Sequence, residues 1–285
     1  MPSPTSWSGF GRSLLDFLMP GACVLCRRPH APHSTPDGIV CGTCMARVVP
    51  LTLPQCYRCG HPRLSLTLAL PPARPAPGEA AAMPSTVELS PCRWCARLAP
   101  EIRAVRSVCR MDQGSGGELV HALKYQGWHV VATPMARRMA RLSWPEDVLE
   151  ERAAVVPMPL SAQRLRERGY NQAEKLARAL SPHWRIPLWS DVLLRARHTR
   201  SQVRLTPSER TTNVSGAFAV PESRRATLRG QHIILVDDVV TTAATLNAAA
   251  RALLDGGARI ISCVTFGRAP DTGDRAVPDD DSLRN

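Results

Sequence analysis

One stretch of the sequence, residues 233–245, constrains the fold more than any other. It reads I-I-L-V-D-D-V-V-T-T-A-A-T. Four consecutive aliphatic residues are typical of a strand that is buried on both faces, as in a parallel sheet. The carboxylates Asp237 and Asp238 follow directly, and residues 246–254 are predicted to form an amphipathic helix that ends at a Gly-Gly pair. In an open α/β sheet, this order places the acids and the following turn where ligands bind, outside the carboxyl ends of the strands.

The turn after the acid pair has the composition of a phosphate site. A helix start of small and hydroxylated residues offers backbone N–H groups, hydroxyls and a positive dipole end to a phosphate monoester. The neighbouring carboxylates would accept hydrogen bonds from sugar hydroxyls, so a ribose 5-phosphate satisfies both halves. The alternative is an ordinary strand–helix unit whose acids only cap the helix. The turn residues are Thr241, Thr242, Ala243, Ala244 and Thr245.

The stretch resembles the 5-phosphoribosyl 1-pyrophosphate (PRPP) motif of type I phosphoribosyltransferases. The resemblance implies that Asp237 and Asp238 hold the ribose hydroxyls in catalysis, that the turn holds the 5-phosphate, and that Mg²⁺ enters with PRPP. One residue departs from the family pattern, which has Gly where this chain has Ala243. A Gly allows close approach of the backbone to phosphate, so the added methyl group is a possible obstacle to binding.

Composition bounds the class of protein. With 285 residues and 44% hydrophobic residues, the chain can bury a substantial core and is predicted to contain one ordinary domain and a smaller one. The formal net charge of +12 favours polyanionic partners, either nucleic acid or phosphorylated small molecules. No stretch has the length of a membrane span. Residues 1–20 have apolar residues at helical spacing but are interrupted by Asp16, which disfavours a signal peptide, so we expect a cytoplasmic protein.

Eight of the ten cysteines occur as four C-x-x-C pairs before residue 96. Two thiolates separated by two residues can bind one tetrahedral Zn²⁺ from a single turn, so four pairs predict two structural Cys₄ sites in a double zinc ribbon. Disulfides and redox-active pairs are the disfavoured alternatives. Sequential pairing gives one site to Cys23, Cys26, Cys41 and Cys44 and the other to Cys56, Cys59, Cys92 and Cys95, with a cross-braced arrangement as the competitor.

The segment between the last two pairs, residues 64–91, is dense in Pro, Ala and Leu and is predicted to be a mobile insertion. Whether the ribbons contact DNA or serve only packing and protein contacts stays open, because few arginines lie between the pairs. We therefore expect residues 1–100 to form an N-terminal helix and double zinc ribbon, and residues 101–270 to form the larger domain. Residues 271–285, which are polar and rich in Asp, are expected to be a disordered tail.

Beyond residue 101 strand and helix signals alternate. Besides the strand at residue 233, the predicted strands are residues 105–111, 153–156, 191–196 and 259–266. The predicted helices are residues 118–125, 129–142, 171–180 and 207–213, the second with Pro134 in its first turns. Repeated strand–helix units predict an α/β fold with a doubly wound, mostly parallel sheet.

Several motifs follow one another over nearly the whole chain. They are A-L-K-Y at 122–125, V-V-P-M-P-L at 155–160, R-x-R-x-R-G-Y-N-Q-A at 164–173, R-A-R-x-T-x-x-Q at 195–202, R-x-x-N at 210–213 and V-D-D-V-V-T-T at 236–242. Together with the C-x-x-C pairs they resemble the ComF family of competence-associated, phosphoribosyltransferase-like proteins. The resemblance implies roles in binding phosphate, pyrophosphate or the substrate loop for Lys124, Pro159, Arg164, Arg168, Asn171, Gln172, Arg195, Thr199 and Gln202.

The resemblance leaves more than one function open. The intact acid pair favours a phosphoribosyltransferase, although no side chain is identified as a general base for an acceptor. The charge and the ribbons favour a non-catalytic module that binds single-stranded DNA or a DNA-uptake partner. A PRPP-responsive regulator would keep ligand binding without turnover. The sequence names neither the acceptor nor the oligomeric state.

Overall fold

The computed structural model describes residues 21–30, 39–63, 92–195 and 216–270. The predictions made for residues 1–20, 64–91, 207–213 and 271–285 lie outside these ranges. Among the described residues, no helix combines the length and apolar character that crossing a membrane requires.

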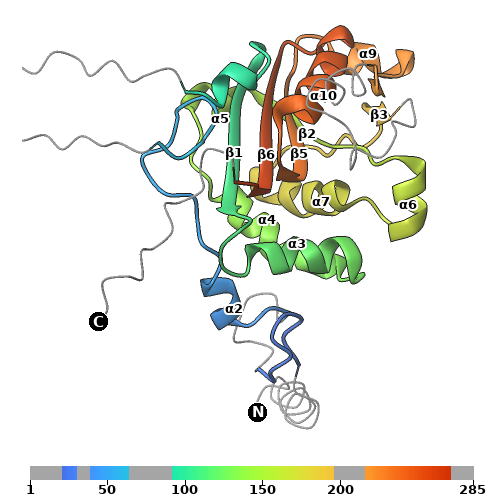
Figure 1. Ribbon diagram of the computed structural model, residues 1–285. Coiled ribbons are helices and arrows are strands. Elements are labelled where there is room, and N and C mark those ends of the chain that lie inside the picture. The colour runs from blue at the N-terminus through green and yellow to red at the C-terminus, as the bar shows by residue number, and fades with distance from the viewer. Residues whose placement is uncertain (1–20, 31–38, 64–91, 196–215, 271–285) are drawn as a thin grey trace, which may run out of the picture.

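A four-stranded, fully parallel sheet forms the centre of the molecule, with strand order β1-β6-β5-β2 (Figure 1). The strands are β1 (Ile102–Arg110), β2 (Arg152–Pro157), β5 (His232–Val240) and β6 (Ile260–Arg268). The predicted parallel α/β sheet is therefore confirmed. The strand signals at residues 105, 153, 233 and 259 all belong to it.

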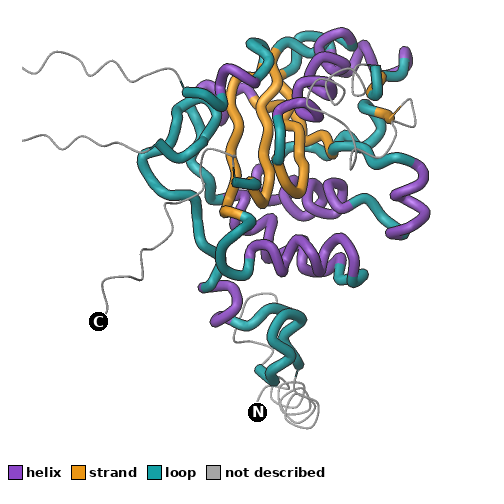
Figure 2. The backbone as a smooth tube through the Cα atoms, in the orientation of Figure 1, coloured by secondary structure: helices purple, strands orange, loops and turns teal. Residues whose placement is uncertain are grey.

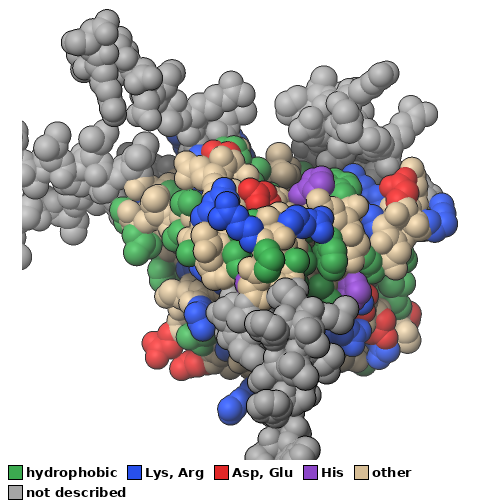
Figure 3. Space-filling model, turned by 90° about the horizontal axis from the view of Figure 1, so that it is seen from below, with side chains coloured by type: hydrophobic (Ala, Val, Ile, Leu, Met, Phe, Trp, Pro, Cys, Tyr) green, Lys and Arg blue, Asp and Glu red, His purple; other side chains and the backbone are tan. Residues whose placement is uncertain are grey.

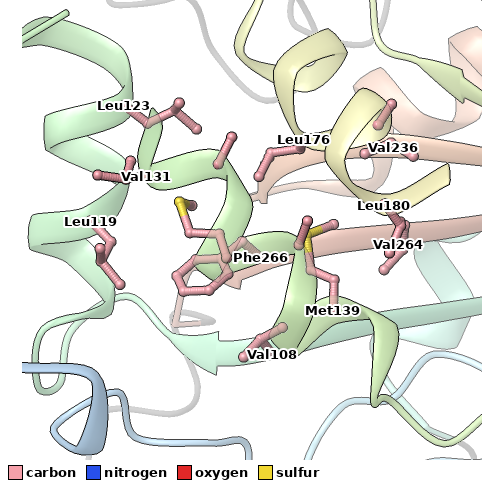
Figure 4. Packing of buried hydrophobic residues seen from close by; sticks show 14 of the residues in the cluster. Val108, Leu119, Leu123, Val131, Met139, Leu176, Leu180, Val236, Val264 and Phe266 are labelled. Carbon is pink, nitrogen blue, oxygen red and sulfur yellow. The ribbon is translucent and has the colours of Figure 1, made fainter. Parts of the chain in front are cut away.

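Helices cover both faces of this sheet. On one side lie α3 (Gly116–Tyr125), α4 (Ala132–Ala140) and α7 (Gln172–Trp184), and on the other α10 (Ala243–Asp255) with α9 (Glu222–Leu228). Successive residues of β5 supply the two cores, because strand side chains alternate between faces. Ile234 and Val236 pack with α3, α4 and α7, and Figure 4 shows this cluster around Phe266. Ile233 and Leu235 pack on the α10 side.

Pro134 lies where a helix tolerates it. The chain makes a 3₁₀ turn, η2 (His129–Val131), before α4 begins at Ala132. Pro134 is thus the third residue of α4. A backbone N–H at this position has no partner within a helix, so a proline, which lacks the N–H, breaks no helical hydrogen bond there. The helix predicted over residues 129–142 is confirmed in this form. Three short helices of this domain, α5 (Glu146–Glu151), α6 (Ala162–Arg168) and α9, are not predicted by the sequence.

The strand predicted at residues 191–196 is wrong as a member of the main sheet. Of the residues in this range that the structure describes, only Leu194–Arg195 form a strand, β3, which pairs antiparallel with β4 (Phe218–Ala219) in a separate two-stranded sheet. The apolar residues that produced the signal, Val192 and Leu193, are buried against the α10 side of the core. Burial of a short apolar run does not by itself distinguish a strand from irregular chain.

The cysteine-bearing segments pack directly on the sheet domain. The first carries α2 (Gly42–Ala46), and the second ends in a 3₁₀ turn, η1 (Cys95–Arg97), before β1 (Figure 2). Residues 50–58 run along the outer edge of β1, where the Val105 N–H donates to the Arg58 carbonyl at 2.9 Å and the Leu51 N–H donates to the Val108 carbonyl at 3.3 Å. These bonds cover backbone groups that an edge strand would otherwise leave unpaired.

Candidate functional site

The acid pair lies within β5, not after it. The sequence predicts that the strand ends before Asp237, but β5 continues to Val240 because β6 pairs with it as far as Arg268. Strand β2 ends earlier, at the Pro157–Val236 pair. On the β2 side, the polar end of β5 is therefore open. Because strand side chains alternate between faces, Asp238 lies on the α3 face with Val236, and Asp237 lies on the α10 face with Leu235.

The two carboxylates have different electrostatic environments. Asp238 is 7% exposed and forms an ion pair with Lys124, in the last turn of α3, whose ammonium nitrogen lies 2.8 Å from its carboxylate. Burial raises the pKa of Asp237 to about 7, the Asp238 charge adds to the rise, and Lys124 opposes it. Near neutral pH the pair therefore carries fewer than two negative charges, so an added cation or hydroxyl donor would find the site partly protonated.

The turn after the acids leads directly into α10. Thr241 and Thr242 are exposed, and the helix begins at Ala243 with Thr242 as its N-cap residue. The Thr242 side chain makes no capping hydrogen bond. Because the first N–H groups of a helix have no partner within it, the donors of this first turn are available to an anion at the positive end of the helix dipole.

Ala243 does not place its methyl group at the surface. The residue is 3% exposed and belongs to the buried cluster that contains Leu246, Ala249 and Ala250. It is also helical and does not have the positive φ that would require Gly. The methyl group therefore packs into the core beneath α10.

The turn at residues 157–160 is held beside the acid pair. The Met158 N–H donates to the carbonyl of Val236, the residue before Asp237, at 2.8 Å. Asn171 caps α7 by accepting from the Ala173 N–H, and its amide donates to the Met158 carbonyl at 3.0 Å. Pro159, the next residue, is half-buried. Asn171 therefore uses both ends of its amide inside the protein, and its contribution here is to position the turn.

The basic residues divide into two groups. Arg168 donates to the Gln172 side chain at 2.9 Å and lies 5.0 Å from the centre of the exposed Tyr125 ring. Gln172 is itself 1% exposed and donates to the Tyr170 carbonyl. Tyr125 was not assigned a role from the sequence, although it directly follows Lys124 in the A-L-K-Y motif. These contacts hold the start of α7 against the end of α3.

Arg195 and Arg164 lie on the Asp237 side. The Arg195 guanidinium lies 5.3 Å from the centre of the Phe218 ring. Burial lowers its pKa, the Arg164 charge lowers it further, and the Asp237 charge raises it. These mutual effects bring Arg164, Arg195 and Asp237 into one electrostatic neighbourhood. Thr199 and Gln202 lie outside the described residues.

Two four-cysteine clusters are present, and they pair sequentially. One is Cys23, Cys26, Cys41 and Cys44, and the other is Cys56, Cys59, Cys92 and Cys95, with the sulfur atoms of each within 4.8 Å of one another. Individual Sγ–Sγ distances include 3.8 Å for Cys26–Cys41 and 3.5 Å for Cys56–Cys95. Four thiolates on a tetrahedral ion with Zn–S bonds of about 2.3 Å lie at such separations. Both clusters therefore fit Zn²⁺, and the sequential assignment is correct.

Family models match two parts of the chain. A phosphoribosyl transferase domain model matches residues 165–283, and a double zinc ribbon domain model matches residues 14–77. The first includes the acid pair and the start of α10. The second includes the first cysteine cluster and the first pair of the second cluster.

Curated relatives are similar over most of the chain. The DNA utilization protein YhgH of Salmonella typhimurium is 30% identical over 251 residues, which cover 85% of this chain and 95% of that protein. Competence protein F of Haemophilus influenzae is 34% identical over 47% of this chain and 55% of its own length. Competence protein ComFC of Bacillus subtilis is 37% identical over 36% of this chain and 39% of its own.

Solved structures include phosphoribosyltransferases at low similarity. A hypoxanthine phosphoribosyl transferase from Trypanosoma cruzi is 18% identical, covers 54% of this chain and 69% of its own, and superposes with a TM-score of 0.31.

Proposed function

The chain belongs to the ComF family of phosphoribosyltransferase-like proteins with an N-terminal double zinc ribbon, and we propose that it binds Mg·PRPP and transfers the phosphoribosyl group to an acceptor. One observation carries this proposal: an acid pair at the open end of β5 is followed, after two exposed threonines, by an uncapped helix start. An ordinary strand–helix unit does not need two acids there, one of them with a strongly raised pKa.

Each half of the site suits one half of the ligand. The N–H groups of Ala243, Ala244 and Thr245 and the hydroxyls of Thr241 and Thr242 would hold the 5-phosphate. Asp237 and Asp238 would accept hydrogen bonds from the ribose 2- and 3-hydroxyls. Their carboxylate oxygens are also ligands that suit Mg²⁺, which would be chelated mainly by PRPP itself. Ala243 is compatible with this assignment because its methyl group is buried.

The remaining residues would position the ligand and stabilise the charges that form as pyrophosphate leaves. Loss of pyrophosphate leaves positive charge on the ribose ring, so catalysis depends on positioning and on groups that compensate the charges. The turn at residues 157–160, held by Asn171, would receive the pyrophosphate. Arg164 and Arg195 on the Asp237 side, with Thr199 and Gln202 of the following segment, would stabilise it as it leaves. Lys124 would divide its charge between Asp238 and a phosphate oxygen.

The direct test is calorimetry with Mg·PRPP on the wild type, Asp237→Ala and Thr242→Val. We expect binding by the wild type and at least tenfold weaker binding by Asp237→Ala, because a hydroxyl left without its charged partner loses about 1.5–3 kcal/mol. Thr242→Val keeps the backbone donors and removes one hydroxyl, so its loss should be smaller. Wild-type protein that does not bind Mg·PRPP would contradict the proposal. Release of pyrophosphate in the presence of individual nucleobases would identify the acceptor.

A second candidate is a non-catalytic module that binds single-stranded DNA or a protein of DNA uptake. The net charge of +12, the two cysteine clusters and the names of the relatives favour it. On the face seen in Figure 3, however, the coloured basic side chains are interspersed with acidic and apolar ones and form no continuous stripe. A groove for a single strand needs such a stripe with stacking aromatics.

These candidates differ in a measurable way. Fluorescence anisotropy with a labelled oligonucleotide, across a range of salt concentrations, would report DNA binding and the number of phosphates contacted. DNA binding that survives Asp237→Ala, together with no PRPP binding, would favour the second candidate. A PRPP-responsive regulator would bind PRPP and show no turnover. For all three we propose a cytoplasmic location, a division at about residue 100, and a role in competence or DNA use.

A further inference from the structure

Helix α10 is fastened to the second cysteine cluster one turn after its start. The Asn247 side chain accepts from the Ala99 N–H at 2.9 Å and donates to the Arg97 carbonyl at 2.8 Å. Arg97 and Ala99 lie two and four residues after Cys95, which completes the last knuckle of that cluster, Cys92–Cys95. Asparagine is a poor residue for a helix interior. Here its amide bridges segments 148 and 150 residues apart. Asn247 thus fixes the distance between the knuckle and the N-terminal turn of α10.

The same cluster also contacts the end of β6, which pairs with the end of β5 just before the turn. Arg268, at the end of β6, donates to the Cys59 carbonyl at 2.6 Å, and its guanidinium lies 4.3 Å from the centre of the Trp94 ring. Arg268 pairs in register with Val240, and the Ala269 N–H donates to the Val240 carbonyl at 2.9 Å. Val240 directly precedes Thr241. The second cluster therefore holds the chain on both sides of the 241–245 turn.

The charges around this cluster fit a bound metal. Four thiolates and one Zn²⁺ leave a net charge of about −2. Three arginine guanidinium groups donate hydrogen bonds to backbone carbonyls in and beside the knuckles. Arg58 donates to Cys95 and Ala99, Arg106 donates to Tyr57 and Arg58, and Arg268 donates to Cys59. Arg106 and Arg268 are 8% and 2% exposed. Such outer contacts orient metal ligands, and without the metal they would surround mobile knuckles.

The first cluster provides an internal contrast. Its anchors among the described residues lie on the opposite face of the sheet, where Ser115 before α3 donates to the Cys44 carbonyl at 2.6 Å and Arg138 of α4 donates to the Met45 carbonyl at 2.6 Å. The two metal sites should therefore have different effects on the turn that begins α10.

We propose that zinc in the second cluster positions the phosphate turn, and that Asn247 is the positioning residue that transmits its effect. The inference rests on the proposed PRPP site. With the metal present, Asn247 and Arg268 hold the N–H groups of residues 243–245 in a fixed direction. Loss of the metal frees the knuckle and with it the start of α10. Because coupling between two ligands is reciprocal, Mg·PRPP must in turn retain this zinc.

The test compares two variants that each remove the side-chain hydrogen bonds from one residue to a cluster, two bonds for Asn247 and one for Ser115. Asn247→Ala acts on the second cluster, and Ser115→Ala acts on the first. Alanine is the better helix former, so weaker binding by Asn247→Ala cannot come from lost helix propensity. By calorimetry we expect Asn247→Ala to bind Mg·PRPP about five- to tenfold more weakly, the size expected for about 1–1.4 kcal/mol of hydrogen bonding. Ser115→Ala should bind like the wild type.

Zinc release provides the second readout. A chromogenic chelator should remove two zinc ions per chain, and saturating Mg·PRPP should slow the release of the ion from the second cluster only, with the clusters distinguished by Cys26→Ser and Cys92→Ser. Asn247→Ala should abolish this protection. Without PRPP, amide hydrogen exchange at residues 243–248 should be faster in Asn247→Ala and in Cys92→Ser than in the wild type.

The outcomes separate the two proposals. If the wild type does not bind Mg·PRPP, the proposed function fails and this inference fails with it. If the wild type binds but Asn247→Ala binds equally well, or if both zinc ions are protected equally, only the inference is overturned. Unchanged amide exchange at residues 243–248 in Asn247→Ala would also overturn it, whatever the result with PRPP.

Discussion

At the scale of single residues, the adjacent carboxylates Asp237 and Asp238 have opposite effects on the stability of the fold. The pKa of the half-buried Asp237 is raised to about 7 from 3.8, because its carboxylate is desolvated and lies beside Asp238. Asp238 is buried too, but it is paired with Lys124. A desolvated carboxylate that has no ion-pair partner costs more stability than one that has such a partner. The proposed site therefore contains a local cost to folding that a ligand with hydroxyl donors and a metal would relieve.

This contrast predicts opposite effects of Asp237→Asn and Asp238→Asn. In the wild type, the folded state keeps the Asp237 proton that the unfolded chain releases, so stability falls as pH rises from about 4 to about 7. At pH 8, Asp237→Asn should be more stable than the wild type by on the order of 2 kcal/mol, and at pH 4 about equal to it. Asp238→Asn should be less stable at pH 8, because it leaves Lys124 without its partner. Urea denaturation at both pH values measures this, and a pH-independent effect of Asp237→Asn would contradict the pKa assignment.

At the scale of elements, the start of α10 and the knuckle formed by Cys56 and Cys59 are the two segments whose backbone geometry matters most. The start of α10 combines an exposed polar turn with a buried first residue. The knuckle approaches β1 so closely that Gly60, with φ of 64°, has no room for a side chain, since a Cβ would lie 2.6 Å from the Val105 carbonyl oxygen. Each element is fixed by a neighbour far away in sequence.

Restoring the family's glycine should not improve phosphate binding. Ala243→Gly removes a buried methyl group and places the less favourable residue in a helix, so we expect a loss of about 1–2 kcal/mol in stability. Because the methyl group faces the core, the affinity for Mg·PRPP should be unchanged or weaker. Calorimetry and urea denaturation on the same protein separate the two effects. A clear gain in affinity would show that the alanine obstructs the ligand.

The knuckle should tolerate no side chain at residue 60. Gly60→Ala combines the strain of a left-handed residue with a backbone clash, while Gly230→Ala, at φ of 72° with open space around it, has the strain alone. We expect Gly230→Ala to cost about 1–2 kcal/mol and Gly60→Ala clearly more. Gly60→Ala should also release one zinc faster. Equal thermal stability of the two variants would mean that the knuckle does not depend on its close contact with β1.

At the scale of the whole molecule, the cysteine clusters belong to the same cores as the sheet. Cys23 and Cys44 are buried in the cluster that contains α3, α4 and α7, and Cys56 and Cys59 are buried in the cluster that contains α10. Hydrogen bonds from Arg106 and Arg268 reinforce the second connection. The two ribbons therefore join the two cores on opposite sides of one sheet, and neither resembles an appended module.

Zinc removal should consequently destabilise the sheet domain and not only the ribbons. Most of the described helical residues lie outside the ribbons, so helical circular dichroism reports on the sheet domain. Chelation should lower the midpoint of its thermal transition by about 10 °C or more, since structural zinc contributes several kcal/mol and each kcal/mol shifts a domain of this size by about 2–4 °C. Readdition of Zn²⁺ should reverse the shift. A helical transition that is insensitive to chelation would show that the ribbons fold independently.

The sequence determined the features that depend on local pattern. Four aliphatic residues before two acids predict a buried parallel strand, and the spacing of the cysteines predicts two four-thiolate sites, because strand burial and metal geometry are set by residues close together in the chain. Only the tertiary structure decided that β5 continues through the acids, that the Lys124 ammonium forms an ion pair with Asp238, and that Ala243 faces the core. It also decided that Asn247 contacts the segment after the Cys92–Cys95 knuckle. Each of these facts depends on which distant segment packs alongside, and the side-chain pattern does not encode that contact.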